Sequence, residues 1–283
     1  MEFLFSEDQE QFRENIARFL ADRSPPTEVR KLMADDQGYD PEVWSMLSNQ
    51  LGLCGIAVAE QYGGAGFGPQ ELAIACEEMG RALYCGPYLA SAVCAAYALS
   101  QTADDDHKQR WLPEIASGGL IACLAVTEHA PMWSEDDVQT VASSSPDGGH
   151  VLNGEKRFVI DAQVAGLILI AARNGENQIG LYAVEANARG LTRKAMPSMD
   201  PTRKLNQLIL AATPAEHLGP VDLQDLMDYT LVALANEMIG GAQTLLQSAL
   251  DYTQLRVQFG RSIASFQAIK HRLAELLLEV ELA

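Results

Sequence analysis

Basic residues are scarce in this sequence, and long apolar runs are missing from it. Lys and Arg number 20 against 38 Asp and Glu among the 283 residues, so the formal net charge is −18. A field of that sign repels nucleic acid and anionic lipid, and we therefore exclude both as partners. No apolar stretch approaches the ~18–20 residues of a membrane-spanning helix. The acidic start MEFLFSEDQE lacks the basic and apolar regions of a secretory signal. These absences predict a cytoplasmic protein.

Cysteine and histidine are too few and too scattered to indicate a metal site. No pair of cysteines has C-x-x-C spacing, and no histidine has a second His or Cys at ligand spacing. The five cysteines lie in apolar contexts: Cys54, Cys76, Cys85, Cys94 and Cys123. Without a secretory signal, such residues are expected to be buried free thiols and not disulfides or zinc ligands.

The hydrophobic pattern changes twice along the chain. The first part is helical, and Ser6 with Gln9 forms a capping-box pattern ahead of the first helix. Further helices are expected over residues 41–51, 69–83, 87–99 and 105–115, the last with Asp104 as its N-cap. From about residue 120, short β-rich runs between Gly, Asn, Asp and Pro clusters predict an antiparallel sheet or barrel, with a turn at Asn153-Gly154. Beyond residue 221 a long helix reaches about residue 258, and a second helix covers 264–283.

We therefore predict an α+β protein, mostly α, with three domains. An N-terminal all-α domain covers residues 1–118, and a central antiparallel β-barrel-like domain covers 119–220. Residues 221–283 begin a C-terminal helical bundle. Its last helix ends in LLLEVELA without a cap, glycine or proline. An apolar helix face needs a partner, so we expect this bundle to be incomplete, either truncated or with a remainder absent from the sequence.

The most informative segment is YTQLRVQFGRSIASFQAIKHRLAELLLEVE, residues 252–281. An arginine at a helix end presents planar donors that suit a pyrophosphate. Gly260 permits a sharp turn between two helices, and Phe259 can pack against an adenine or against the helix junction. The plain alternative is a helical hairpin whose arginine lies in solvent. The R-x-x-F-G pattern, followed by Gln267, resembles the hallmark of the acyl-CoA dehydrogenase family.

In that family the hairpin reaches into the FAD site of a neighbouring subunit. The resemblance thus implies FAD as the cofactor. It implies cofactor contacts for four residues of the hairpin: Arg256, Gln258, Phe259 and Gln267.

A second stretch, LAVTEHAPMWSEDD, resembles the family's strand that ends in T-E and leads to a serine. There the threonine and nearby backbone groups face the pyrimidine edge of the flavin, which implies cofactor contacts for Leu124, Val126 and Thr127. The serine lies near phosphate and coenzyme A, which makes Ser134 the substrate-binding candidate. The family's usual P-G-A-G-S is replaced by residues 129–134, HAPMWS, so the loop has lost its glycines and gained a residue.

A third stretch, residues 154–172, resembles the strand pair in which family members show K-x-W-I-T-N-G. Phe158 stands where the tryptophan stacks near the flavin, and Ile160 stands where a threonine hydrogen-bonds it. An aromatic ring is kept and a hydroxyl is lost. Two more matches are the glycine-rich loop with its following helix, residues 60–83, and the D-x-T-R sequence that ends at Arg203, which we interpret as structural. The resemblance extends from Phe3 to Leu282.

The resemblance implies α,β-dehydrogenation of an acyl-CoA thioester to the trans-2-enoyl-CoA. A carboxylate removes the α-proton while the β-hydrogen leaves as hydride to the flavin. In most of the family the catalytic glutamate lies beyond the point where this sequence ends. In a minority it lies at the start of the long helix before an arginine, and those positions are Thr230 and Leu231. Glu237 lies on the same helix, where we expect a structural role. No catalytic residue is assigned.

Two functions remain open at this point. The chain is a dehydrogenase whose base lies in a downstream segment, or it is a non-catalytic subunit that completes a FAD site shared with a catalytic paralogue, as in heteromeric members acting on bulky acyl chains such as steroid side chains. The expected partners are an acyl-CoA substrate from fatty-acid or steroid side-chain β-oxidation and a second subunit, in a homodimer, a homotetramer or a heteromer. An electron-transfer flavoprotein is a possible electron acceptor in such a system.

Overall fold

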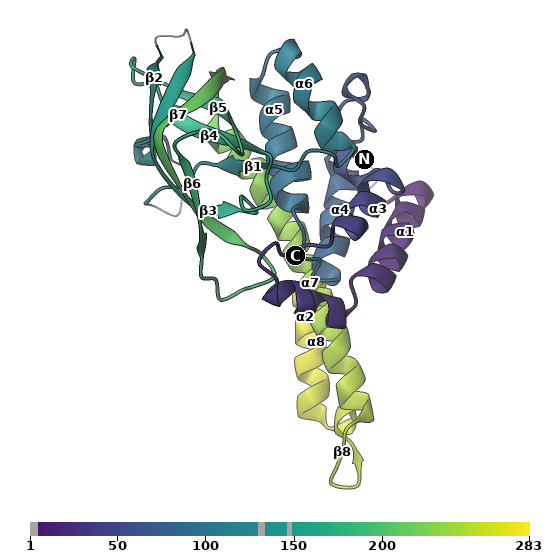
Figure 1. Ribbon diagram of the computed structural model, residues 1–283. Coiled ribbons are helices and arrows are strands. Elements are labelled where there is room, and N and C mark those ends of the chain that lie inside the picture. Colours follow the sequence, from purple (N-terminus) through teal and green to yellow (C-terminus); the bar gives the residue numbers. More distant parts are fainter. Residues whose placement is uncertain (1–4, 130–133, 146–148) are drawn as a thin grey trace.

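The computed structural model describes residues 5–129, 134–145 and 149–283 (Figure 1). Its first part is helical, as predicted. The capping box at the start is confirmed, because the Ser6 hydroxyl accepts from the Gln9 amide at 3.2 Å and the Ser6 amide donates to the Gln9 side chain at 2.9 Å. Asp104 caps the sixth helix by accepting from the His107 amide at 2.9 Å. The elements of this part are α1 (Glu7–Arg23), α2 (Pro26–Ala34), α3 (Pro41–Asn49), η1 (Leu53–Gly55), η2 (Glu60–Tyr62), α4 (Pro69–Arg81), η3 (Tyr88–Ala95), α5 (Ala96–Thr102) and α6 (Asp105–Ala116).

Two features of this helical part were not predicted from the sequence. Helix α2 begins directly after Pro25, with Pro26 in its first turn, where the missing amide of proline costs no hydrogen bond. The second feature is η3, which is a π-helix and not the first turns of an α-helix. All eight of its residues are buried.

The second part is a seven-stranded sheet that closes into a barrel-like shape. Strand β7 pairs with β3, β5 and β6, and β5 also pairs with β4, which bonds to β1 and β2. Most pairs are antiparallel, but β1–β4 and β2–β4 are parallel. The strands are β1 (Ala122–Ala125), β2 (Val141–Ser144), β3 (His150–Ile160), β4 (Leu167–Arg173), β5 (Ile179–Glu185), β6 (Leu191–Met196) and β7 (Leu205–Pro220), with the short helix η4 (Glu135–Asp137) between β1 and β2.

The turn predicted at Asn153-Gly154 is wrong. Strand β3 runs through both residues, and its pairing with β7 shifts register between Leu152 and Gly154, so the sequence marks a β-bulge. Gly154 has φ +153°, and a Cβ there would lie 2.6 Å from the Thr140 hydroxyl. The glycine is required by the close approach of β3 to Thr140, the residue before β2, and not by a reversal of the chain.

Strand β4 separates the two hydrophobic cores of the molecule. Leu167, Leu169 and Ala171 pack into the core shared with the helices, whereas Ile168 and Ile170 face the interior of the barrel. The alternation has the two-residue period of a strand, yet both faces are apolar because both are covered. The sheet is therefore fixed against the helical part through β4 and its neighbour β1.

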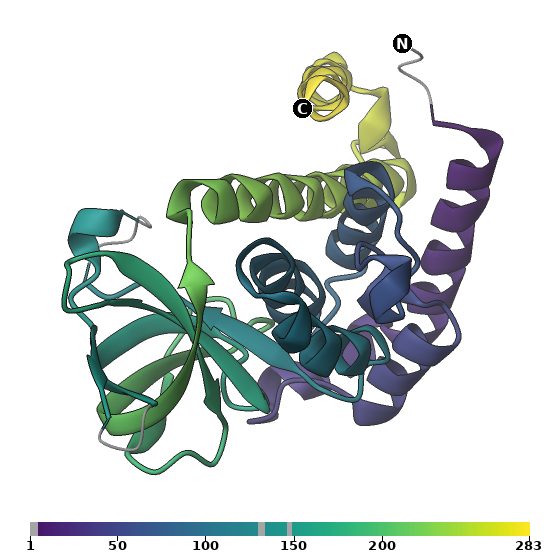
Figure 2. The same cartoon turned by 90° about the horizontal axis from the view of Figure 1, so that it is seen from above.

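The third part is a long helical hairpin that projects from the body of the molecule (Figure 1). It consists of α7 (Leu223–Leu255), β8 (Val257–Gln258), β9 (Arg261–Ser262), η5 (Ile263–Ser265) and α8 (Gln267–Leu282). Figure 2 shows α7 running from the sheet, past the N-terminal helices, to the hairpin. None of the helices within the described part of the chain is long and apolar enough to cross a membrane.

Helices α4 and α7 cross at two glycines. A Cβ on Gly80 would lie 1.8 Å from the Glu237 carbonyl oxygen, and a Cβ on Gly240 would lie 1.8 Å from the Glu77 carbonyl oxygen. The backbones of the two helices are therefore in direct contact. This contact sets the distance of α7 from the N-terminal helices and so the position of its first turns beside the sheet.

Candidate functional site

A cavity of about 280 Å³ lies where β1 and β3 meet the first turns of α7 and the π-helix η3. Five residues predicted from two separate stretches of sequence line it together: Leu124, Val126, Thr127, Phe158 and Ile160. The fold brings the two stretches together because the segment that follows β1 lies beside β3, with the Arg157 amide donating to the Thr127 carbonyl at 2.8 Å. The lining is mainly apolar, as a flat aromatic or acyl group would require.

Phe158 adopts an unusual backbone conformation at the mouth of this cavity. Its φ is +55°, in the left-handed region that bulky residues rarely occupy, and its side chain is 48% exposed. Its amide donates to the Met196 sulfur at 3.4 Å. Such a conformation costs ~1–3 kcal/mol and is usually kept where it serves a site. The Phe158 ring therefore lines the cavity and is about half exposed.

A buried ion pair supports the floor behind Val126 and Thr127. The Lys156 ammonium donates to Glu128 at 2.6 Å and to the Val126 carbonyl at 3.0 Å. Glu128 also accepts from the Thr140 amide and hydroxyl, at 2.9 and 2.7 Å. Burial alone raises the pKa of Glu128, but the ammonium and these hydrogen bonds outweigh it and lower the pKa. The end of β1 is therefore locked to β3 in a fixed geometry.

The wall contributed by α7 carries no group able to remove a proton. Thr230 donates its hydroxyl to the Leu226 carbonyl at 2.8 Å and lies 3.5 Å from the Cys94 sulfur. Burial raises the pKa of the Cys94 thiol to about 11. Leu231 stands beside Thr230 on the lining. Of the described residues that line the cavity, none is Asp or Glu.

Glu237, the remaining carboxylate considered on α7, is held in an ion pair with Arg203. Arg203 belongs to the D-x-T-R sequence, in which Asp200 accepts from the Thr202 amide at 3.0 Å. This loop connects β6 with β7, and the ion pair fastens it to α7. Neither Arg203 nor Glu237 lines the cavity, which is in keeping with the structural roles predicted for both.

Asp161 lies buried at the end of the same strand that carries Phe158 and Ile160. Its φ is +54°, and its amide donates to the Lys204 carbonyl at 3.0 Å. Burial raises the pKa of Asp161 to about 6, although Arg203 and Lys204 lower it. The acid occupies the place of the asparagine in the family's K-x-W-I-T-N-G, and it was not among the site residues predicted from the sequence.

The hairpin residues lie far from this cavity within one chain. Phe259 and Gly260 form the two-residue turn between β8 and β9, with φ values of +52° and +78°. The Phe259 ring is 90% exposed. Arg261 lies over the Phe266 ring at 4.2 Å, and the Ile263 amide donates to the Arg256 carbonyl at 2.9 Å. The tip is thus ordered by its own contacts, and Arg256, Gln258, Phe259 and Gln267 are all exposed.

Ser134 does not line the cavity. Its hydroxyl accepts from the Asp136 amide at 3.3 Å and caps η4. Its role towards coenzyme A stays a prediction. The residues of the altered loop before it, Ala130 to Trp133, lie outside the described residues.

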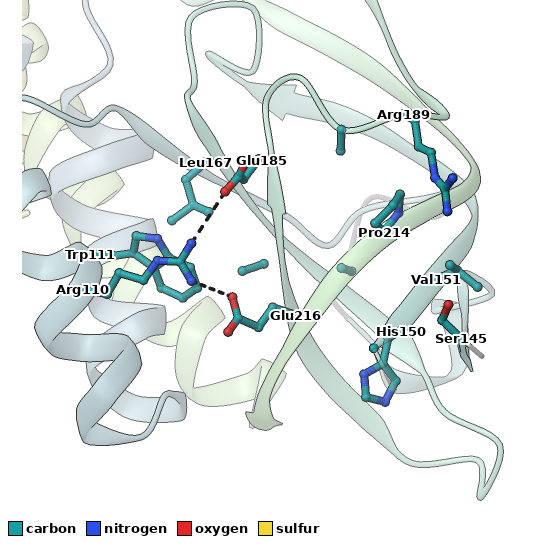
Figure 3. Close-up of a pocket in the computed structure, with 14 residues that line it drawn as sticks. Arg110, Trp111, Ser145, His150, Val151, Leu167, Glu185, Arg189, Pro214 and Glu216 are labelled. Carbon is teal, nitrogen blue, oxygen red and sulfur yellow. Dashed lines mark hydrogen bonds and ion pairs between the residues drawn. The ribbon is translucent and has the colours of Figure 1, made fainter. Parts of the chain in front are cut away.

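A second cavity, of about 420 Å³, lies on another side of the sheet against α6 (Figure 3). Arg110 bonds Glu216 at 2.9 Å and approaches Glu185 at 3.6 Å, and it stacks over Trp111 at 4.7 Å. None of the residues predicted from the sequence lines this cavity. Because Arg110 of α6 is paired with these two acids of the sheet, we regard the cavity as a contact between the helices and the sheet.

Reasoning from sequence missed six residues of the first cavity. Ala90 and Cys94 come from the π-helix, Met227 and Leu234 come from α7, and Arg157 and Val159 come from β3. A helix with apolar residues all round predicts burial but not which side faces a cavity. A π-helix changes which side chains face the cavity, because its winding differs from 3.6 residues per turn. No local feature of the sequence predicted this π-helix.

Comparison with known proteins agrees with this architecture. The family model described as the acyl-CoA dehydrogenase N-terminal domain matches residues 6–119, and the one described as the C-terminal domain matches residues 222–283. Acyl-CoA dehydrogenase IpdE2 of Mycobacterium tuberculosis is 32% identical over 277 residues, covering 98% of this chain and 73% of its own length.

Two solved structures show the same fold. The Tcur3481-Tcur3483 steroid ACAD superposes with a TM-score of 0.87 at 28% identity, over 97% of this chain and 74% of its own. The ChsE4-ChsE5 complex from Mycobacterium tuberculosis gives 0.89 at 25% identity, over 99% of this chain and 76% of its own. The predicted fold class is confirmed. This chain belongs to the acyl-CoA dehydrogenase family.

Proposed function

We propose that this chain is a subunit of a FAD-dependent acyl-CoA dehydrogenase, which converts an acyl-CoA thioester to the trans-2-enoyl-CoA. One observation carries the proposal. Five flavin-contact candidates from two strands converge on one cavity, while the pyrophosphate candidate Arg256 stands exposed and ordered at the tip of a projecting hairpin. A single chain thus offers two halves of a cofactor site that cannot meet each other. Two chains are needed to join them.

The residues around the cavity fit a flavin ring in part. Phe158 offers an open aromatic face, and the strand end at Val126 and Thr127 offers backbone groups in a geometry fixed by the Glu128–Lys156 pair. Ile160 offers no hydrogen bond, where a threonine would. FAD, when bound, accepts the β-hydrogen of the substrate as hydride. The contribution of this chain is to orient the ring, exclude water through its apolar lining, and hold the diphosphate of a neighbour's cofactor through Arg256.

The described residues that line the cavity include no carboxylate that could remove the α-proton of the substrate. The lining has Thr230 and Leu231 at the start of α7, and the nearby carboxylates Glu128 and Glu237 are both tied into ion pairs. A base therefore has to come from a downstream segment of this subunit or from a different subunit.

A second candidate function is that of a non-catalytic partner subunit. The observation that favours it is the apolar wall formed by Ile160 and Leu231, where a catalytic family member has polar groups. The relatives support such an arrangement, since ChsE4-ChsE5 is a complex. The steroid ACAD relative also suggests a bulky acyl group as the substrate class. An electron-transfer flavoprotein as acceptor, and a cytoplasmic location, stay predictions.

The test is to purify the chain alone and together with a paralogous acyl-CoA dehydrogenase chain, and to record the flavin spectrum. The proposal expects yellow flavin that bleaches when acyl-CoA thioesters of increasing bulk are added. Bleaching by the lone chain would reject the partner-subunit candidate. Flavin in neither sample, with both proteins folded by circular dichroism, would reject the proposal itself.

A further inference from the structure

A third cavity, of about 520 Å³, lies beside the start of β7 and is rich in basic side chains. It is bounded by β6, by the loop that joins β6 to β7, and by the loops that follow α2 and β3. Arg193, Arg203 and Lys204 line it, and Asp36 is the one acid among the described residues that do so. Such a concentration of positive charge is unexpected in a chain with a net charge of −18.

Two of these cations have no carboxylate within ion-pair distance in the described part of the chain. Arg193 donates to three backbone carbonyls instead, at 2.6, 3.1 and 2.6 Å. The Lys204 ammonium donates to the Met33 carbonyl at 2.8 Å. Carbonyl oxygens orient a cation but supply no full counter-charge, and both side chains are partly buried, which makes a missing counter-charge costly. The hydrogen bonds therefore hold two uncompensated charges in the cavity wall.

The acids nearby offset these charges only in part. Glu237 is already engaged by Arg203, and Asp36 is exposed on the loop after α2. Asp161 is close enough for Arg203 and Lys204 to lower its pKa, but burial outweighs them and raises that pKa to about 6. A buried carboxyl that is harder to ionise than a free aspartate is a weak counter-charge. The cavity thus keeps an excess of positive charge.

The hydrogen-bond donors of the cavity suit an oxyanion. The Ser198 hydroxyl accepts from the Asp200 amide at 3.2 Å, so its own proton is available to an acceptor. Lys204 has further ammonium protons beyond the one that it donates to a carbonyl. These donors and Arg193 come from different segments of the chain. A phosphate group, with a charge of about −2 and three acceptor oxygens, matches such a set better than a planar carboxylate does.

We propose that this cavity is a binding site for the phosphate group of a small molecule, separate from the flavin cavity. Arg193 and Lys204 supply the positive charge, and Ser198 supplies a hydroxyl. The cavity is larger than a single phosphate group requires, so it has room for the organic part of a phosphate ester. It adjoins the first cavity, because the sulfur of Met196 in its lining accepts from the Phe158 amide at 3.4 Å. A bound phosphate therefore fastens β6 and the loop before β7 beside the wall that carries Phe158.

Isothermal titration calorimetry at pH 7 and constant ionic strength tests the site, with inorganic phosphate as the probe. We expect saturable binding with a Kd of about 1 mM or below. Ser198→Asp places a carboxylate in the cavity and Lys204→Gln removes a cation, so each should weaken binding about tenfold or more. Ser45→Asp on α3 and Lys194→Gln on β6 make the same charge changes at exposed positions outside the cavity lining and should bind phosphate like the parent.

Further arms of the titration identify the ligand and its source. Acetate should bind at least about tenfold more weakly than phosphate, and equal binding would overturn the assignment to phosphate. Glucose 6-phosphate that binds more tightly than inorganic phosphate supports a phosphate ester as the natural ligand, and weaker binding supports free phosphate. Binding should be the same with and without one equivalent of FAD on the protein. Loss of binding on loading with FAD would assign the cations to the cofactor and overturn a separate site.

The exposed Ser198 decides the outcome if Lys204→Gln fails to fold by circular dichroism. Unchanged binding by Ser198→Asp, or no saturable binding by the parent below ~10 mM phosphate, would overturn the proposal. These titrations do not depend on retained flavin or on turnover, so a negative result leaves the proposed function standing.

Discussion

Replacing Asp161 by asparagine should stabilise the protein at neutral pH. The carboxyl is buried, with 6% of its surface exposed, and burial raises its pKa to about 6. An unfolded aspartate has a pKa of ~3.9, so the shift is about two units, and each unit is worth ~1.4 kcal/mol. Ionisation of Asp161 therefore costs the fold about 3 kcal/mol at pH 7. Asparagine keeps the shape of the neutral acid, and it tolerates the left-handed backbone at least as well.

The sign of the pH dependence follows from proton binding. Between about pH 4 and pH 6 the folded state holds the Asp161 proton and the unfolded state does not, so the free energy of unfolding falls as pH rises through that window and levels off above it. Between pH 5 and pH 7 the advantage of Asp161→Asn over the parent should grow by roughly 1 kcal/mol. Asp106→Asn, at an exposed site in the first turn of α6, is the matched control and should show no such growth.

Urea unfolding at pH 5, 6, 7 and 8, followed by circular dichroism, measures both quantities. Other groups titrate in the same range, but they do so in the parent and in the variant alike, so their contributions cancel in the difference. The reasoning fails if Asp161→Asn is less stable than the parent at pH 7. It also fails if the difference between the two proteins is flat from pH 5 to pH 8.

Three further predictions concern the helix crossing, the buried ion pair and the hairpin. Gly240→Ala should lower the free energy of unfolding in urea by roughly 3 kcal/mol or more, because its Cβ would lie 1.8 Å from a carbonyl oxygen. Gly241→Ala, whose Cβ would lie 3.7 Å from its nearest neighbour, should raise the free energy of unfolding by ~0.5–1 kcal/mol. Equal effects of the two substitutions would contradict the crossing geometry. Lys156→Met should cost about 3–5 kcal/mol, since it leaves Glu128 charged and buried, and a loss below ~1 kcal/mol would show that the pair is not desolvated. Arg256→Gln should reduce flavin retention, measured as the 450 to 280 nm absorbance ratio, about tenfold or more while the melting temperature of the apoprotein stays the same; unchanged retention would remove this arginine from the cofactor site.

The order of helices, sheet and hairpin followed from periodicity, because amphipathic helices and half-buried strands differ in their spacing of apolar residues. The cavity lining was foreseen only where a short motif marked a strand end, as at Thr127 and Phe158. Side chains from the π-helix could not be foreseen, since the winding of η3 depends on tertiary packing around residues that are all apolar. The turn prediction at Asn153-Gly154 failed for a related reason. Gly154 is needed because Thr140 lies close to it in space, and the local sequence does not reveal that contact.

Charge accounting gives the strongest physical reason for a shared site. Around the cavity three carboxylates are neutralised within the chain, with Glu128 on Lys156, Glu155 on Arg157 and Glu237 on Arg203. At the hairpin the situation is reversed, because within the described part of the chain Arg256 and Arg261 have no carboxylate partner. An arginine that is exposed and ordered in a strongly acidic protein is available to bind an anion. Of the described residues that line the cavity, Arg157 is the one cation, and it is paired with Glu155; this supports the proposal that the arginine of another chain binds the diphosphate.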